Sequence, residues 1–331
     1  MATTTLTRTQ QRIDQLLAHD TDDTAAFDGY YQDCLRFIST HLMAFYVRYA
    51  DENGLSMKQT QQRVSAWDLR QWKQAIDSID MANWDAQAKQ RARVIGIQAG
   101  FSRTAMLGAL VSIGVVAMTA NYQQSIIDRV RADGLDEIKH ATTQFPIRGQ
   151  ERAVSKQRKK RLRSEPKKLT SIVDQASTKE MWSANLWLDS DKLAHDVQYL
   201  VTKRLRHGMT VQDMQELLQA HDNKAQFKPT QSAADRLAQS KLNARRILIT
   251  ESQRVNYHVD LTSMMIRGVK YVNWVNEPKS CDNCQGLADM SPYNVNDCPK
   301  IPEDSHPNCR CHIEPAQGVE ATKVTGFNTL T

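Results

Sequence analysis

Apolar residues recur at helical spacing through most of the chain. Between residues 27 and 49 they alternate in steps of three and four, which places them on one face of a helix. Asn53 and Gly54 break this pattern, and further helices are expected after them. Because His41 and Cys34 lie on the first apolar face, we interpret both as packing residues rather than ligands.

The segment from residue 104 to residue 120 contains no charged side chain. A membrane-spanning helix needs about 20 mainly apolar residues, and this segment is shorter and rich in Ala, Gly, Ser and Thr. We therefore interpret it as a buried helix or as a contact in an oligomer, and we expect no membrane partner. Gly108 and Ser112 would allow a neighbouring helix, from this chain or from another, to approach closely.

Helical patterns continue through the second half of the chain and change near its end. A helix is expected to end at Gly208, and Thr210 with Asp213 resembles a capping box for the next helix. A longer helix follows over residues 237–257, and the β-rich residues 269–275 predict a strand that leads into a group of cysteines. The sequence thus predicts a mainly α fold, with an elongated helical body and a small C-terminal α+β module.

The amino-acid composition supports this fold class. The chain has 331 residues but only 13 Gly and 9 Pro, a balance that suits long helices. Its length favours two or three domains over one globule. We expect a helical N-terminal domain, a basic hinge, a second helical region, and the strand-containing Cys/His module with its tail. Their expected bounds are 1–147, 148–168, 169–265 and 266–331.

The formal net charge of +6 comes from one segment of the chain. Ten Lys and Arg side chains lie between residues 148 and 168 against two Glu, and the remainder is close to neutral. One interpretation is a solvated hinge, because like charges resist compaction and Pro166 interrupts any helix. The other is contact with nucleic-acid phosphates, which Lys and Arg neutralise with release of counterions. The candidate DNA-binding residues are Arg158, Lys159, Lys160, Arg161 and Arg163.

Five of the six cysteines lie close together near the C-terminus, with His306 among them. The first residues of the chain lack the apolar core of a secretory signal peptide, so we expect a cytoplasmic protein with reduced thiols. Clustered cysteines in that setting indicate a metal site rather than disulfides.

The spacing of these residues predicts a zinc site. Cys281 and Cys284 form a C-x-x-C pair, and His306, Cys309 and Cys311 supply a second close group. Zinc prefers four tetrahedral nitrogen and sulfur ligands, and a metal could supply folding energy to a module with few large apolar residues. The preferred ligands are Cys281, Cys284, His306 and either Cys309 or Cys311. The isolated Cys298 is a reserve.

A structural zinc site is favoured over a catalytic one and over chance clustering. Catalytic zinc in Cys-rich deaminases comes with an H-x-E motif and a P-C-x-x-C motif, but no H-x-E precedes this C-x-x-C, and Ser280 stands before Cys281. The chain also lacks the nucleotide-binding, metalloprotease and serine-hydrolase motifs. We therefore expect a protein that is not an enzyme and has no small-molecule substrate.

Several motifs together resemble one family. They are W-S-A-N-L-W at residues 182–187, the helix ending at Gly208, the Ile-Thr-Glu run at 249–251, and a C-x-x-C followed by the sequence HPNCRC. Residues 169–315 resemble the Mu F-like minor head, or head morphogenesis, proteins of tailed bacteriophages, and HPNCRC is the most specific element.

This resemblance implies a minor capsid protein of the virion, made in the host cytoplasm. Such a protein would bind the portal and major capsid proteins and act in head assembly and in DNA packaging or delivery. The resemblance also implies that the five Cys and His residues above are zinc-site positions. It assigns no role to Thr250 or Glu251, and we expect Glu251 to pair with an arginine such as Arg245 or Arg246. The alternative function is a zinc-stabilised nucleic-acid-binding protein that uses the basic segment 148–168.

Overall fold

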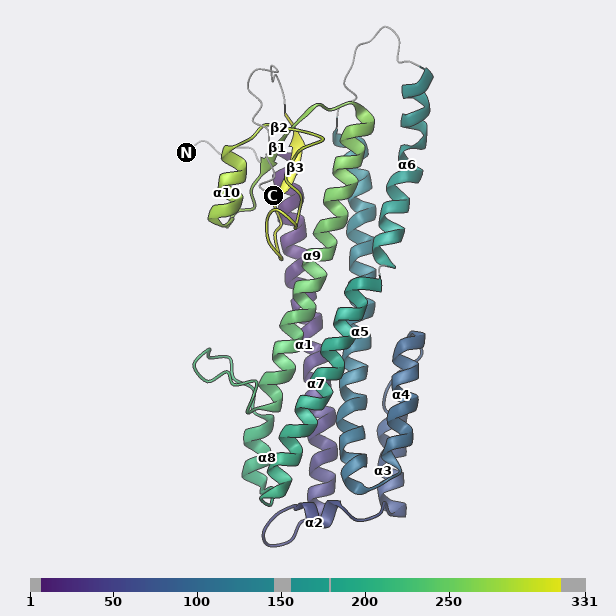
Figure 1. The fold of residues 1–331 in the computed structure, drawn as a ribbon, viewed down its shortest axis with the longest axis vertical. Coiled ribbons are helices and arrows are strands. Elements are labelled where there is room, and N and C mark those ends of the chain that lie inside the picture. The colour runs from purple at the N-terminus through teal and green to yellow at the C-terminus, as the bar shows by residue number, and fades with distance from the viewer. Residues whose placement is uncertain (1–6, 146–155, 179, 317–331) are drawn as a thin grey trace. The chain divides into compact units, whose positions relative to one another are not determined.

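The predicted fold class is confirmed by a computed structural model, which describes residues 7–145, 156–178 and 180–316 (Figure 1). Within these residues the chain is mainly α, and its few strands form one small sheet near the C-terminus. The helices are α1 (Arg8–Tyr49), α2 (Met57–Thr60), α3 (Ala66–Asp77), α4 (Ala86–Ala99), α5 (Arg103–Gln144), α6 (Lys156–Ser177), α7 (Glu180–Arg206), α8 (Val211–Leu218), α9 (Ala233–Arg267) and α10 (Asp282–Asp289). The strands are β1 (Tyr271–Val275), β2 (Tyr293–Asn294) and β3 (His312–Pro315).

The chain forms two compact units, each assembled from separate stretches of sequence. Unit 1 comprises Met1–Thr24, Ser125–Lys179 and Arg245–Thr331, and unit 2 comprises Ala25–Gln124 and Glu180–Ala244. The long helices α1, α5 and α9 therefore each contribute residues to both units. The boundaries predicted from the sequence, in contrast, divide the chain into consecutive segments.

The uncharged segment of α5 is a core element of unit 2. Ile113 and Val115 are fully buried, and Gly114 lies against the side chains of Phe37 and Ile38 in α1. On the α7 side, Gln198 donates a hydrogen bond to the Gly108 carbonyl over 2.9 Å. This close contact agrees with the expectation that small residues here allow neighbouring helices to approach.

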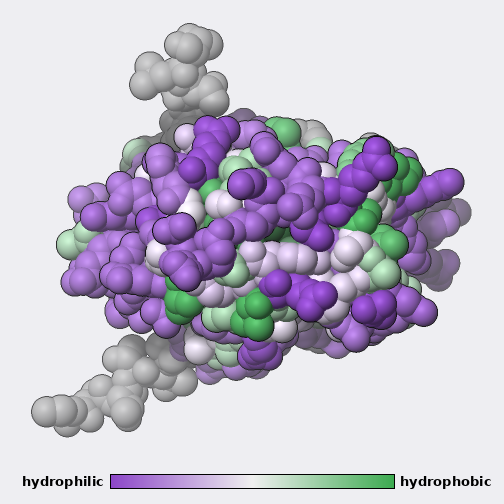
Figure 2. Space-filling view, turned by 90° about the horizontal axis from the view of Figure 1, so that it is seen from below, coloured by the Kyte–Doolittle hydropathy of each residue, from purple (hydrophilic) through white to green (hydrophobic). Residues whose placement is uncertain are grey.

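The apolar character of α5 fits its burial. By length and composition α5 could cross a membrane, but 72% of its most apolar window is buried inside the protein. The face of the molecule in Figure 2 is mostly hydrophilic, with scattered hydrophobic side chains. The core of unit 2 thus accounts for the apolar segment.

Two glycines allow the chain to turn in unit 2. Gly54 and Gly208 have φ angles of +90° and +78°, in the left-handed region that favours glycine. A Cβ atom would lie 2.4 Å from the Met209 carbonyl oxygen at Gly54 and 2.7 Å from the Asn53 carbonyl oxygen at Gly208. The predicted break at residues 53 and 54 and the helix end before Gly208 are both confirmed. The capping box of Thr210 and Asp213 is also present at the start of α8.

The predicted interruption at Pro166 is wrong. Residues 156–168 belong to helix α6, which continues through Pro166, while residues 148–155 of the expected hinge lie outside the described part of the chain. Tertiary contacts stabilise the helix beside the proline. The buried Glu165 accepts a hydrogen bond from Ser263 (2.7 Å) and pairs with Arg267 (2.8 Å), both in α9. These contacts offset the backbone hydrogen bond that proline cannot make.

Gly134 in α5 provides a test of the packing of unit 1. A Cβ atom there would lie 2.6 Å from a methyl group of Val255 and 2.7 Å from one of Val173. We expect Gly134→Ala to lower the free energy of unfolding by about 1–3 kcal/mol through overpacking. The measurement is urea unfolding followed by circular dichroism.

The matched control is Gly29→Ala in α1, where no atom lies within 4 Å of an added Cβ. This change should raise the stability by about 0.5–1 kcal/mol, because alanine favours a helix interior. A Gly134→Ala protein as stable as the Gly29→Ala protein would contradict the packing of α5 against α6 and α9.

Candidate metal centre

The small sheet brings two distant stretches of chain together. Strand β1 lies between β2 and β3 and pairs antiparallel with both, with Val275 opposite His312. The residues that follow β1 therefore lie beside those that precede β3. The Glu277 side chain accepts a hydrogen bond from the Arg310 backbone N–H over 3.1 Å, which fixes the HPNCRC segment at the end of β1.

Helix α10 positions the C-x-x-C pair. Cys281 is the N-cap residue, and Cys284 lies in the first turn. A short Cys-Cys spacing at this position lets both sulfur atoms face one ion. Cys281 is exposed, whereas Cys284 is buried, so the pair extends from the surface of the module into its interior.

All five predicted ligands meet in one place, hereafter the Cys/His cluster. The ligand atoms of Cys281, Cys284 and His306 lie within 4.8 Å of one another. Those of Cys284, Cys309 and Cys311 do so as well, and the Cys284 and Cys309 sulfurs are 3.7 Å apart. Since Cys284 belongs to both groups, the Cys/His cluster could hold a metal ion.

The electrostatics of the Cys/His cluster favour a cation. A hydrogen bond from the Cys311 thiol, together with the nearby His306, lowers the pKa of Cys309 to about 6. A backbone N–H of Cys284 lowers the pKa of Cys281. Burial and the charge of Cys309 raise the pKa of Cys284 instead. The closely packed sulfur atoms of the Cys/His cluster therefore hold protons between them when no metal is bound. A metal ion can replace those protons.

His306 is oriented for metal binding. Its Nδ1 lies 2.8 Å from the Pro307 carbonyl oxygen, which can accept the Nδ1 proton. The lone pair is then on Nε2, which is buried and has no hydrogen-bond partner in the described structure. An outer hydrogen bond that fixes the imidazole in this way is typical of metal-binding histidines.

Cys298, the reserve candidate, lies outside the Cys/His cluster. Its sulfur is 3.3 Å from the Tyr257 hydroxyl and within reach of the Val295 carbonyl. Cys298 is thus a buried packing residue. Glu277, which was not predicted from the sequence, lies beside the Cys/His cluster. One of its carboxylate oxygens is within 4.8 Å of the His306 and Cys309 ligand atoms.

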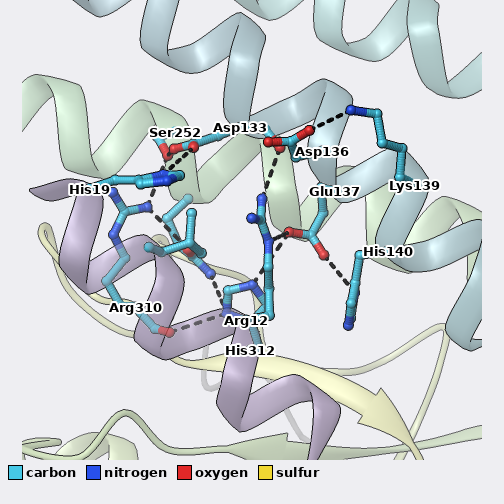
Figure 3. A network of polar contacts seen from close by, with 12 residues as sticks. Arg12, His19, Asp133, Asp136, Glu137, Lys139, His140, Ser252, Arg310 and His312 are labelled. Carbon is cyan, nitrogen blue, oxygen red and sulfur yellow. Dashed lines mark hydrogen bonds and ion pairs between the residues drawn. The ribbon is translucent and has the colours of Figure 1, made fainter.

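Arg310, within the HPNCRC motif, was also not predicted. Its side chain is 1% exposed and lies among the helices of unit 1, near Ser252 (Figure 3). Its Nε lies 2.9 Å from Asp20 Oδ2 in α1, and its guanidinium donates to Ser252 in α9 over 2.9 Å. The alternation of side chains in an extended Cys-Arg-Cys-His stretch is the sequence signal that could have indicated this role.

The Ile-Thr-Glu run of α9 contacts the same module. The Thr250 hydroxyl accepts a hydrogen bond from the backbone N–H of Asn308 over 3.2 Å. Glu251 pairs with an arginine, as expected, but the partner is Arg254, one turn along α9, rather than Arg245 or Arg246. Arg254 also pairs with Glu303 of the module (3.1 Å). Three residues separate Glu251 from Arg254, which places both side chains on one helix face.

Helix α6 carries the candidate nucleic-acid-binding residues. Lys159, Lys160, Arg161 and Arg163 are exposed, whereas the Arg158 side chain lies outside the described part of the structure. The four described side chains therefore form a basic surface on one helix.

In comparisons with protein-family models, curated proteins and solved structures, no match to the chain was found. The geometry of the Cys/His cluster is therefore the main guide to its chemistry.

We expect Cys284→Ser to abolish metal binding at the Cys/His cluster, because Cys284 is the residue shared by both ligand groups. The purified chain should carry one fewer metal ion than wild type by elemental analysis, and its C-terminal module should lose protection from proteolysis. The control is Cys298→Ser, which leaves the Cys/His cluster intact and should not change the metal content. Equal metal content in wild type and Cys284→Ser would rule out the Cys/His cluster as the binding site.

Proposed function

We propose that the Cys/His cluster binds one structural zinc ion and that the chain is a minor head protein of a tailed bacteriophage. In this role it is not an enzyme. It binds the portal and major capsid proteins in the virion head, and it acts in head assembly and in DNA packaging or delivery after synthesis in the host cytoplasm.

The donor set supports zinc. Thiolates with one imidazole are soft ligands that select zinc over magnesium, calcium or manganese. Five side chains compete for four positions, so the protein itself can complete a tetrahedral shell and leave no position for a reacting water. A Glu277 oxygen accepts a hydrogen bond from the backbone N–H of Arg310. This contact favours a role for Glu277 in positioning the HPNCRC segment over a role as a general base.

The observation that carries the head-protein proposal is the convergence of the motif residues in unit 1. HPNCRC, the C-x-x-C pair and the Ile-Thr-Glu run are separated in sequence, but they share one set of contacts. Asn308 binds Thr250, and Arg254 links Glu251 to Glu303. The motifs thus act as parts of one structural module, as the resemblance to Mu F-like proteins implies.

The proposal is tested by co-expression with the portal and major capsid proteins of the phage that encodes the chain. We expect this chain to co-sediment with proheads that contain the portal and to be absent from proheads assembled without it. Proheads that contain the portal but exclude the chain would contradict the proposal. Cys284→Ser should reduce incorporation, because it removes the metal that stabilises the module.

A second candidate function rests on the surface of α6. Seven basic side chains are exposed there between residues 156 and 168, and the only acidic residue among the described side chains of that segment, Glu165, is buried in an ion pair. Such a surface binds nucleic-acid phosphates independently of sequence. A chain with this activity would be a zinc-stabilised nucleic-acid-binding protein.

Replacing Lys159, Lys160, Arg161 and Arg163 together with glutamine tests this second function. If each contacts a phosphate, DNA affinity should fall and the slope of log K against log salt should flatten by about 3–4. Fluorescence anisotropy at several salt concentrations measures both quantities. The control replaces four exposed basic residues of unit 2, Lys58, Arg70, Lys73 and Lys89, and should leave the slope unchanged. Equal slopes in both variants would reject α6 as the DNA contact.

A further inference from the structure

A second group of metal-ligand side chains lies on the other side of the HPNCRC stretch. Glu137 of α5, Asp260 of α9 and His312 of β3 form this group, hereafter the Glu/Asp/His cluster. All three belong to unit 1. We propose that the Glu/Asp/His cluster binds a divalent first-row transition-metal ion through two carboxylates and one imidazole, independently of the zinc proposed at the Cys/His cluster.

The geometry of the Glu/Asp/His cluster suits a single small ion. One ligand atom from each of the three residues lies within 4.8 Å of the others. Glu137 Oε2 and His312 Nε2 are 3.8 Å apart, a separation that ligands on one metal ion can reach with little movement. The three residues come from two helices and a strand, and Figure 3 shows Glu137 and His312 near each other, beside Arg12. A site assembled from three elements needs the complete fold of unit 1.

Burial without hydrogen bonds indicates a missing partner. Glu137, Asp260 and His312 are each at most 1% exposed. Asp260 Oδ1 and His312 Nε2 have no hydrogen-bond partner in the described structure, and neither polar atom of the buried Asn256 has one. A buried polar atom that stays unsatisfied destabilises the fold, because it has lost its hydrogen bonds to water. A cation bound by both carboxylates and the imidazole would give Asp260 Oδ1 and His312 Nε2 a common partner.

The imidazole of His312 is arranged as a metal ligand. Its Nδ1 is 3.1 Å from the Arg310 carbonyl oxygen, which can accept the Nδ1 proton and leave the lone pair on Nε2. Gln253 Nε2 is also 3.1 Å from Nδ1, and it donates one of its two protons to the Cys311 carbonyl over 2.7 Å. These contacts at Nδ1 hold the ring with Nε2 toward Glu137, and the tautomer with its proton on Nδ1 can bind a metal through Nε2.

The surroundings of Glu137 hold its carboxylate in place. Arg12 Nε lies 2.8 Å from Oε2, and Arg12 also donates to the Asp133 carbonyl over 3.1 Å. His140 Nδ1 lies 2.9 Å from Oε1. Each carboxylate oxygen retains a lone pair for a metal, since one hydrogen-bond donor uses only one of its two. Arg12 and His140 are therefore positioning residues in the outer shell.

The competing arrangement is a proton shared by the two carboxyl groups. Burial, with the charge of Glu137, raises the pKa of Asp260 well above its usual value, so a protonated Asp260 could donate to Glu137. A shared proton would satisfy the carboxyl groups, but His312 Nε2 is 3.8 Å from Glu137 Oε2, which is too far for a hydrogen bond between them. A metal ion satisfies all three residues, which is why we favour it.

The two proposed sites can be distinguished by their ligands, because the Glu/Asp/His cluster offers oxygen and nitrogen and the Cys/His cluster offers mainly sulfur. Manganese(II) prefers carboxylate and imidazole ligands and binds thiolates poorly, whereas zinc prefers the Cys/His cluster. In the experiment, the purified, zinc-containing chain is dialysed against MnCl₂, and all metal ions per chain are counted by elemental analysis. We expect two ions per wild-type chain, of which at least one is zinc. We expect one ion per chain in Asp260→Asn. Electron spin-echo spectroscopy of bound manganese should detect one imidazole nitrogen.

The matched control is Asp136→Asn, which removes a carboxylate from the same helix at a side chain that is 46% exposed. It should bind two ions, as wild type does. If Asp260→Asn does not fold, Glu137→Gln serves in its place, with circular dichroism to verify folding. One ion per wild-type chain, two ions in the folded variant, or bound manganese without imidazole nitrogen would each overturn the proposal. Loss of zinc in Cys284→Ser tests the other site separately.

Discussion

The buried ion pair between Arg310 and Asp20 is the interaction on which unit 1 depends. It joins a residue of the C-terminal module to α1, 290 positions away in sequence. The pair is part of a larger network, because Arg129 of α5 contacts Asp20 (3.6 Å) and binds Asp133 (2.6 Å). Removal of one partner from a buried pair costs about 3–5 kcal/mol, since the other charge remains uncompensated. The module is thereby held against the helices by charge as well as by packing.

One extended stretch, residues 309–312, connects this network with the metal chemistry. Cys309 and Cys311 face the Cys/His cluster, while Arg310 and His312 face the helices. Side chains alternate across an extended backbone, so a metal ion on one side would fix the direction of the side chains on the other. Metal binding by the thiols would therefore be coupled to docking of the module through four consecutive residues.

Helix α9 supplies the complementary surface. Thr250, Gln253, Arg254 and Tyr257 all contact the module, and their spacing of three and four places them on one helix face. The Ile-Thr-Glu run is part of this docking face rather than a separate site. This arrangement gives a physical role to a motif whose residues have no evident chemistry of their own.

The sequence by itself determined the mainly α fold, several helix ends and the five members of the Cys/His cluster. Each of these depends on local information: hydrophobic period, capping residues, glycine, or a short spacing between cysteines. Only the tertiary structure decided that α6 continues through Pro166, that Arg310 pairs with Asp20, and that Glu137, Asp260 and His312 meet. These features depend on contacts between residues distant in sequence, or on burial that can outweigh a local preference. Local periodicity carries no record of such partners, because the packing of whole helices brings them together.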